Sequence, residues 1–369
     1  MRPWLGAEEA AALTDVIASG WVAQGPRVAE FERALSARVG AAQGVAASSG
    51  TAALQLSMVV LGLGPGDEVI VPSLSYIATA NAPRSVGATP VFADVDPLTQ
   101  NLTPATIEAV VTPATRAVIV VHQAGVPADM EAVHALCDPL GIAVVEDAAC
   151  ALGAVYRGRP IGSHSDLVVF SFHPRKVITT GEGGMVMTTR ADWADRLRRL
   201  RDHGASISAW VRHDTSLAIE EYVEAGFNFR MSDLLAAVGL VQLERLDAIV
   251  ARRRALAHVY QDALSDRAGL QVVVDPHWGH ASFQSYWVVL PEALPITRDE
   301  LLRRLFERGI LARRGIMAAH LEPTFAGHPH TALPVTERMT RQSLLLPLFH
   351  DMTEAEQGRV VDAVRSELA

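Results

Sequence analysis

The sequence contains little cysteine, no excess of basic charge and no apolar run long enough to cross a membrane. Its two cysteines, Cys137 and Cys150, are too few for a disulfide framework and fit a reducing compartment. Apolar runs such as 117–121 reach only the length of a strand. Residues 1–9 include Arg2 but lack the apolar stretch of a signal peptide. We therefore expect a soluble, cytoplasmic protein with no membrane partner.

Basic residues are outnumbered by acidic ones. The chain has 32 Lys and Arg residues against 41 Asp and Glu residues, which gives a formal net charge of −9. Such a surface repels phosphate backbones, so we expect no nucleic-acid partner. No G-x-G-x-x-G motif follows an early strand, which argues against a nicotinamide-binding domain. The hydrophobic content of 49% is typical of a globular protein.

Short apolar runs alternate with helical patterns over the first two-thirds of the chain. The predicted strands are 68–71, 90–93, 117–121, 142–145, 167–170 and 184–187, and the predicted helices are 52–61, 77–86, 104–110 and 128–136. Strands that are apolar on both faces and separated by helices predict a mostly parallel sheet covered on both sides. The sequence thus predicts a three-layer α/β/α fold.

The last third of the chain has a different pattern. One long helix is predicted over 232–264, with Ser232 as its cap. Predicted strands at 271–274 and 286–290 and helices at 298–308 and 353–367 then indicate a smaller α+β domain. We therefore divide the chain into a large domain, 1–250, whose N-terminal segment can pack on the other domain, and a small C-terminal domain, 251–369.

Three segments carry candidate chemistry. Gly50 and Thr51 open a predicted helix, whose free N–H groups suit a phosphate, or only a simple serine or threonine cap. Asp147 follows a predicted strand, at the edge where such sheets bind ligands. Its carboxylate either pairs with a cation, such as a protonated pyridine nitrogen, or caps the next turn. Lys176 precedes the glycine-rich run 181–184, which implies close backbone approach, although a lone lysine is usually a surface residue.

Together these segments resemble the DegT/DnrJ/StrS sugar aminotransferases, a family of the fold-type I pyridoxal phosphate enzymes and of the aspartate aminotransferase superfamily. The resemblance covers nearly the whole chain. Its most specific part is Ser171-Phe172-His173 with Lys176 and 180–184. The other matching stretches are 19–21, 24–26, 31–32, 50–54, 64–69, 78–82, 127–130, 146–149, 227–232 and 239–243.

The resemblance implies a pyridoxal phosphate cofactor, which becomes pyridoxamine phosphate in the half-reaction, and no metal. Lys176 is then the Schiff-base lysine, and Asp147 holds the proton on the ring nitrogen. The residues implied to surround the cofactor are Gly50, Thr51, Ala52, Tyr76, Asp147, Cys150, Ser171, His173, Lys176 and Asn228. Of these, Tyr76 corresponds to an aromatic residue that stacks on the ring, although core packing would also explain it. Asn228 corresponds to a residue that reaches the phosphate of the partner subunit, which implies a homodimer with shared sites, or else it is a turn residue.

The chain departs from the family pattern in places. Cys150 stands where many members have Gln or His, which puts a contact to the ring hydroxyl in doubt. Ser49 replaces a common Asn, and 122–125 lacks the aromatic residue often found there. A His in place of Lys176 marks the dehydratase branch, so the retained lysine favours amino transfer.

Candidate acceptor contacts are weaker. Trp21, Arg313, Arg314 and His320 are the candidates, since Arg pairs well with phosphate, although Arg313 and Arg314 also fit a solvated helix end. Residues 284–287 either line the mouth of the acceptor pocket or begin a strand. We expect amino transfer from L-glutamate or L-glutamine to a nucleotide-linked keto-deoxysugar, as in amino sugar biosynthesis for antibiotics or polysaccharides. The alternatives are a glutamine-dependent keto-cyclitol aminotransferase of the scyllo-inosose type, a sugar dehydratase and a non-catalytic regulator.

Overall fold

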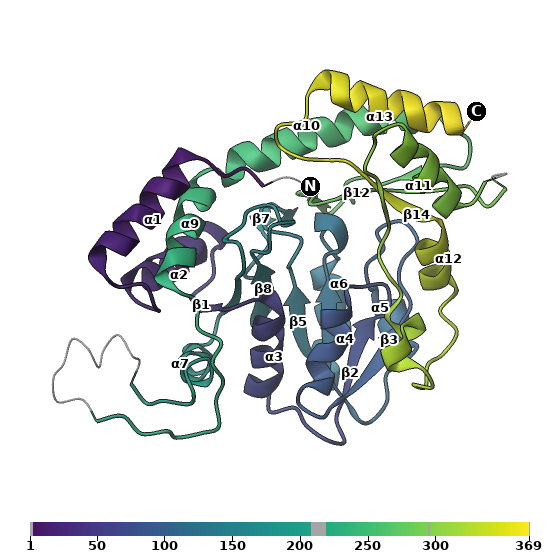
Figure 1. Ribbon diagram of the computed structural model, residues 1–369. Coiled ribbons are helices and arrows are strands. Elements are labelled where there is room, and N and C mark those ends of the chain that lie inside the picture. Colours follow the sequence, from purple (N-terminus) through teal and green to yellow (C-terminus); the bar gives the residue numbers. More distant parts are fainter. Residues whose placement is uncertain (1–2, 208–218, 294–295, 369) are drawn as a thin grey trace.

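A seven-stranded sheet forms the centre of the large domain, in the order β1-β9-β8-β5-β4-β2-β3 (Figure 1). The computed structural model describes residues 3–207, 219–293 and 296–368. The strands are β1 Gln43–Ala47, β2 Glu68–Pro72, β3 Thr89–Ala93, β4 Thr115–Val121, β5 Ala143–Asp147, β8 Leu167–Ser171 and β9 Gly184–Thr188. All neighbours from β3 to β8 pair in parallel, whereas β9 is antiparallel to β8 and β1. The predicted mostly parallel sheet is confirmed, with β9 as its reversed strand.

Helices cover both faces of this sheet because its strands are apolar on both sides. In β2, Val69 and Val71 pack on one face with side chains of α3, α4 and α7, and Ile70 packs on the other with α2, α5 and α6. The helices are α2 Pro26–Val39, α3 Gly50–Val60, α4 Ile77–Arg84, α5 Pro104–Glu108, α6 Met130–Cys137 and α7 Ala191–Leu200. Burying one such valine or isoleucine stabilises the fold by about 1.5–3 kcal/mol. The predicted three-layer α/β/α architecture is confirmed.

A smaller sheet follows, with the strand order β10-β12-β14-β13 and antiparallel pairing throughout. Its strands are β10 Gln271–Val272, β12 Tyr286–Val289, β13 Arg313–Arg314 and β14 Ser343–Leu346, and its helices are α10 Leu246–Leu264, α11 Arg298–Glu307, α12 Pro334–Gln342 and α13 Glu354–Glu367. Tyr286 and Trp287 are buried in β12, so they begin a strand rather than line a mouth. A third sheet, β11-β6-β7, consists of β6 Val155–Tyr156, β7 Arg159–Pro160 and β11 Gly279–His280.

The predicted single long helix over 232–264 is wrong in one respect. It is two helices, α9 Asp233–Glu244 and α10, separated at Arg245. Arg245 pairs with Glu9 of α1 (Ala7–Ser19) at 2.7 Å and lies over the ring of Trp4. Trp4 in turn stacks on His350 at a centroid distance of 3.8 Å. The break is therefore made by long-range contacts with the N-terminal segment, since no Gly or Pro marks it in the sequence.

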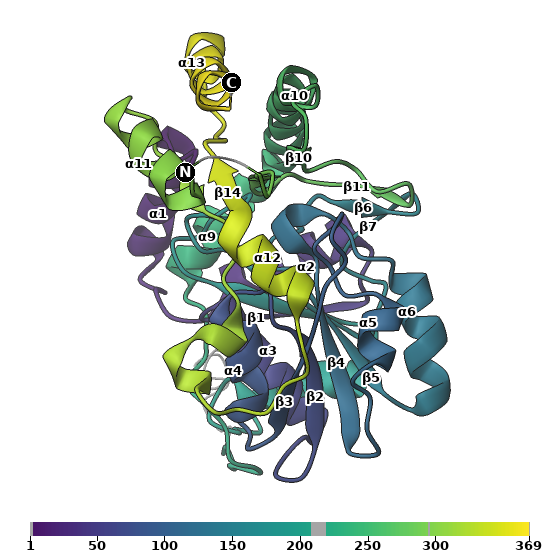
Figure 2. The same cartoon turned by 90° about the vertical axis from the view of Figure 1, so that its right-hand side faces the viewer.

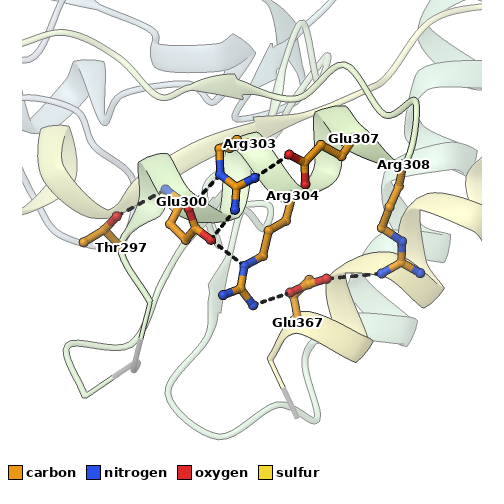
Figure 3. Close-up of polar contacts among 7 residues, drawn as sticks. All are labelled: Thr297, Glu300, Arg303, Arg304, Glu307, Arg308 and Glu367. Carbon is orange, nitrogen blue, oxygen red and sulfur yellow. Dashed lines mark hydrogen bonds and ion pairs between the residues drawn. The ribbon is translucent and has the colours of Figure 1, made fainter.

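An ion-pair cluster joins α11 to α13 (Figure 3). Glu300 accepts hydrogen bonds from Arg303 and Arg304, each at 2.7 Å, and these pairs lower the pKa of Glu300 to about 2. Arg304 also pairs with Glu367 of α13 at 3.1 Å. Because these groups are partly exposed, water screens their attraction, so each pair contributes little to stability. None of the helices in the described ranges is long and apolar enough to cross a membrane.

The segment 317–336 returns from the small sheet to the outer edge of the large one (Figure 2). Ala319 N–H donates to the Ser73 carbonyl at 2.7 Å, just after β2. His328 Nε2 donates to the Pro90 carbonyl of β3 at 2.7 Å. Further along, the N–H groups of Val335 and Thr336 donate to the Asp94 carboxylate at the end of β3. The chain beyond residue 250 therefore also covers part of the large domain.

Candidate cofactor and active site

Asp147 is the last residue of β5, at the carboxyl edge of the parallel strands. Its carboxylate is buried and accepts hydrogen bonds from the Thr79 hydroxyl at 2.9 Å and from the Ala149 N–H at 3.2 Å. Within the described ranges, no basic side chain forms an ion pair with it. A buried carboxylate held by two neutral donors is stabilised further by a cation. The site therefore fits a protonated pyridine nitrogen.

Lys176 lies in the turn after β8, the strand next to β5. Its Nζ is 3.2 Å from the sulfur of Cys150, and its backbone N–H donates to the His173 carbonyl at 2.8 Å. Cys150 is only three residues beyond Asp147 in the chain. The carboxylate at the end of β5 and the amine in the turn after β8 therefore lie at one edge of the sheet, where an aldehyde cofactor could attach to the amine beside the carboxylate.

The start of α3 forms a cradle for an anion beside this pair. Ser49 caps the helix by accepting from the Ala52 N–H at 3.1 Å. A Cβ added to Gly50 would lie 2.8 Å from the Cβ of Ser171, and one added to Gly184 would lie 2.4 Å from the Ser49 carbonyl oxygen. Only glycine permits these approaches. The helix N-terminus and the Ser171 hydroxyl thus meet where a phosphate group would fit.

The remaining predicted cofactor contacts lie around this edge. Thr51, in the first turn of α3, is exposed, and Ala52 is buried. Tyr76 precedes α4 and is 66% exposed, so its ring is free to receive a planar partner. His173 is half-buried, and burial lowers the pKa of its imidazole. Asn228 is exposed, and its neighbour Phe229 accepts a hydrogen bond from the Ser48 N–H at 2.7 Å.

The four predicted acceptor contacts are spread over separate segments of the chain. The Trp21 indole donates to the Gln24 carbonyl at 3.1 Å. Arg313 and Arg314 are exposed on β13. His320 is buried, with Nδ1 2.6 Å from the Ser73 hydroxyl, which precedes Tyr76 by three residues. An acceptor role for each stays a prediction.

Two features of the site escaped sequence reasoning. The Thr79 hydroxyl contacts Asp147 across 68 positions, and the sequence carries no signal for that contact. The second feature was visible in the sequence: among 32 basic residues, Lys176 is the single lysine. A chain that uses arginine everywhere else has retained one ε-amine at a strand end. Arginine cannot replace it in covalent catalysis, because the guanidinium stays protonated.

A buried hydrogen-bonded pair, His122 and Glu146, lies behind the site. His122 Nε2 is 3.0 Å from Glu146 Oε2, and both side chains are fully buried. His122 Nδ1 accepts from the Ala128 N–H at 3.0 Å, so Nε2 carries the proton that is donated to Glu146. Burial alone would raise the pKa of Glu146, but the hydrogen bonds from His122 and Ser165 outweigh it and lower that pKa. The backbone N–H of His122 also donates to the backbone carbonyl of Asp147 at 3.2 Å, so this pair is directly connected to the site.

The chain is similar over its whole length to solved aminotransferases. It shares 36% identity with TlmJ from Streptoalloteichus hindustanus, with a TM-score of 0.92 and coverage of 100% of this chain and 97% of that one. It shares 38% identity with S. venezuelae DesV, solved with a ketimine intermediate, with a TM-score of 0.91 and coverage of 98% and 94%. With DesI, solved in the presence of its TDP-sugar product, it shares 35% identity, with a TM-score of 0.90 and coverage of 100% and 91%.

Residues 3–365 match the DegT/DnrJ/EryC1/StrS aminotransferase family. This match agrees with the fold, the single lysine and the buried carboxylate described above. The predicted family, fold class and cofactor are confirmed. The protein is a transaminase of the DegT/DnrJ/EryC1/StrS family, whose members depend on pyridoxal phosphate.

Proposed function

We propose that the protein transfers an amino group from L-glutamate or L-glutamine to the keto group of a nucleotide-linked keto-deoxysugar. The observation that carries the proposal is that the Lys176 amine and the buried Asp147 carboxylate follow or end two adjacent strands, beside the Gly50–Ser171 cradle. Support for the acceptor class comes from DesI, which was solved with a TDP-sugar product. A reducing, cytoplasmic location is supported by the two free cysteines.

Each predicted site residue has a separate role in this reaction. When bound, pyridoxal phosphate supplies an electron sink for the charge left by proton removal. Lys176 provides the amine that attaches the cofactor and then moves the proton. Asp147 keeps the ring nitrogen charged, and the first turn of α3 with Ser171 holds the phosphate. Cys150 lies against the Lys176 amine as a weak thiol partner.

The acceptor is tested best in a single turnover. Protein loaded with pyridoxamine phosphate is mixed with one acceptor at a time, and the return of the yellow cofactor band is followed. We expect a TDP-linked keto-deoxysugar to restore the band, and the same sugar without its nucleotide to restore it at least about tenfold more slowly, because the phosphate contacts are lost. Restoration by scyllo-inosose alone would instead support the keto-cyclitol function. No restoration by any ketone, and no response to either donor, would contradict amino transfer.

We also propose that the active protein is a homodimer in which Asn228 serves the partner's site. Asn228 is exposed, and so are Tyr222 at 63% and Val223 at 55% on the same segment. Exposed aromatic and aliphatic side chains beside a polar group are typical of an interface between subunits.

Mixing two inactive variants tests the shared site. Lys176→Ala and Asn228→Ala proteins are each expected to be nearly inactive, but co-expression should restore activity. One site of each mixed dimer then has both an intact lysine and an intact partner asparagine. Because about half of randomly formed dimers are mixed and each has one working site of two, we expect about one quarter of wild-type activity.

The same experiment has a clear opposite outcome. If Asn228 served its own subunit, every site in the mixture would lack one residue, and activity would stay at the level of the separate variants. Light scattering on each variant controls for loss of the dimer. A monomeric, fully active wild-type protein would also contradict the proposal.

A further inference from the structure

Residues 282–285, here called the bridging segment, lead into β12 and contact three loops of the large domain. The Ser282 N–H donates to the Gly125 carbonyl at 3.1 Å, and its hydroxyl lies 3.3 Å from the Cys150 carbonyl. The Gln284 side-chain amide donates to the Arg175 carbonyl at 2.6 Å. These three loops follow β4, β5 and β8. The bridging segment therefore touches the residue before Lys176 and the residue whose sulfur contacts the lysine amine.

The bridging segment lies very close to the backbone of the large domain at Gly125. This residue has a φ of +91°, and a Cβ there would lie 2.4 Å from the Ser282 hydroxyl and 2.9 Å from the Cys150 carbonyl oxygen. Phe283 is fully buried with a φ of +47°, a conformation that a bulky residue adopts only when its surroundings enforce it. A close approach that only glycine permits and the unfavourable conformation of Phe283 thus occur in one contact region, which indicates that other residues hold the bridging segment in position.

Arg253 of α10 supplies that restraint. It is 3% exposed, and its Nη1 donates to the carbonyls of Phe283 and Gln284, each at 3.1 Å. Within the described ranges it forms no ion pair with a carboxylate. Burial lowers the pKa of Arg253 to about 10, so it is still charged at neutral pH. Burying a cation without a carboxylate partner costs free energy. Here the guanidinium instead donates to two carbonyl groups and orients them.

We propose that Arg253 and Gln284 are positioning residues for the catalytic lysine. Arg253 fixes the backbone of the bridging segment, and the Gln284 amide then fixes the Arg175–Lys176 peptide. Ser282 fixes the loop that carries Cys150, against which the lysine amine lies. The inference deepens the proposed function and rests on it, because Lys176 needs a defined direction only if it holds the cofactor.

Gln284→Leu is the most direct test, since it removes the amide and keeps the size of the side chain. Gln261→Leu is the matched control, because the Gln261 amide also donates to a backbone carbonyl, that of Val273 at 2.8 Å, away from the site. In the loaded protein, we expect Gln284→Leu to lower kcat about tenfold or more with little change in the donor KM, since a misplaced group costs rate rather than binding. The pH midpoint of the cofactor's visible band should also shift. Gln261→Leu should change neither.

A measurement without cofactor separates this inference from the proposed function. In apo protein, iodoacetamide should alkylate Cys150 at least about threefold faster in Gln284→Leu than in wild type, because a loosened loop exposes the thiol more often. Cys137 is an internal reference, since it is buried and burial raises the pKa of its thiol to about 11. Mass spectrometry assigns each site. Arg253→Lys should also raise the rate of Cys150 alkylation, because an ammonium lacks the guanidinium's planar fork.

The outcomes are distinct. Unchanged Cys150 alkylation and an unchanged band midpoint in a folded Gln284→Leu protein would overturn the positioning role, even with full cofactor binding. Failure of the wild-type protein to bind pyridoxal phosphate would instead remove the proposed function, and the alkylation rates would still report on the bridging segment. If Arg253→Lys does not fold, Gln284→Leu decides alone.

Discussion

Replacing Lys176 with alanine will abolish amino transfer while leaving the fold intact. Lys176 is the single lysine among 32 basic residues, so no other ε-amine in the chain can take its place. Its side chain is half-buried and contacts Cys150, which makes its loss mild for packing. We expect activity to fall by roughly three orders of magnitude or more, which corresponds to about 4 kcal/mol of lost transition-state stabilisation.

The single lysine also makes this experiment unusually clean. An endoproteinase that cuts after lysine should cleave the denatured wild-type chain once, into fragments 1–176 and 177–369. Borohydride reduction of the loaded protein should attach the cofactor to Lys176 and block that cut. Lys176→Arg keeps the charge but not the reactivity, and should be as inactive as the alanine variant. Cofactor fixed to Lys176→Ala at another position, or activity within tenfold of wild type, would contradict the assignment.

Replacing Asp147 with asparagine should cost activity about 100-fold or more, or about 2.7 kcal/mol. The amide keeps the size of the carboxylate and can still accept a hydrogen bond, but it carries no charge. The ring nitrogen of the cofactor would then lose its buried counter-charge and most of its protonation, and with it the capacity to accept electrons. We also expect weaker cofactor binding, measured by titration of the visible band.

Asp94→Asn is the matched control for this variant. Asp94 also lies at the carboxyl end of a strand of the same sheet, but its carboxylate accepts the N–H groups of Thr336 and Val335, at 2.7 and 3.0 Å, from the segment that covers β3, besides that of its neighbour Val95. Its replacement should lower the midpoint of thermal unfolding and leave the cofactor spectrum unchanged. Equal activity losses in both variants would mean that Asp147 acts through the fold. A loss of less than about threefold in Asp147→Asn would contradict its role at the ring.

The strand ends that build the site were predictable because each signal is local. Predicted strands at 142–145 and 167–170 lie within or overlap β5 and β8, and Asp147 and Lys176 fall at or just after their carboxyl ends. Continuous apolar runs bounded by turn residues are sufficient to locate such strands, and parallel pairing then brings their ends to one edge.

The parts that could not be predicted depend on contacts between distant residues. The break at Arg245 is set by Glu9 and Trp4, more than 230 positions away. The Gln284 amide meets the Arg175 carbonyl across 109 positions. Neither contact leaves a periodic pattern in the chain, because a single hydrogen bond constrains one side chain and not its neighbours.

The cover on β3 has a consequence for how the protein is made. β3 is one of the two outer strands of the large sheet, and its edge is covered by His328 and by the residues that donate to Asp94. Chains emerge from the ribosome N-terminus first, so all seven strands are complete long before residue 336 appears. In that interval a nascent chain presents an open β edge that can pair with another molecule. Slow translation between residues 190 and 336 would lengthen this period, and truncated chains would be the form most prone to aggregate.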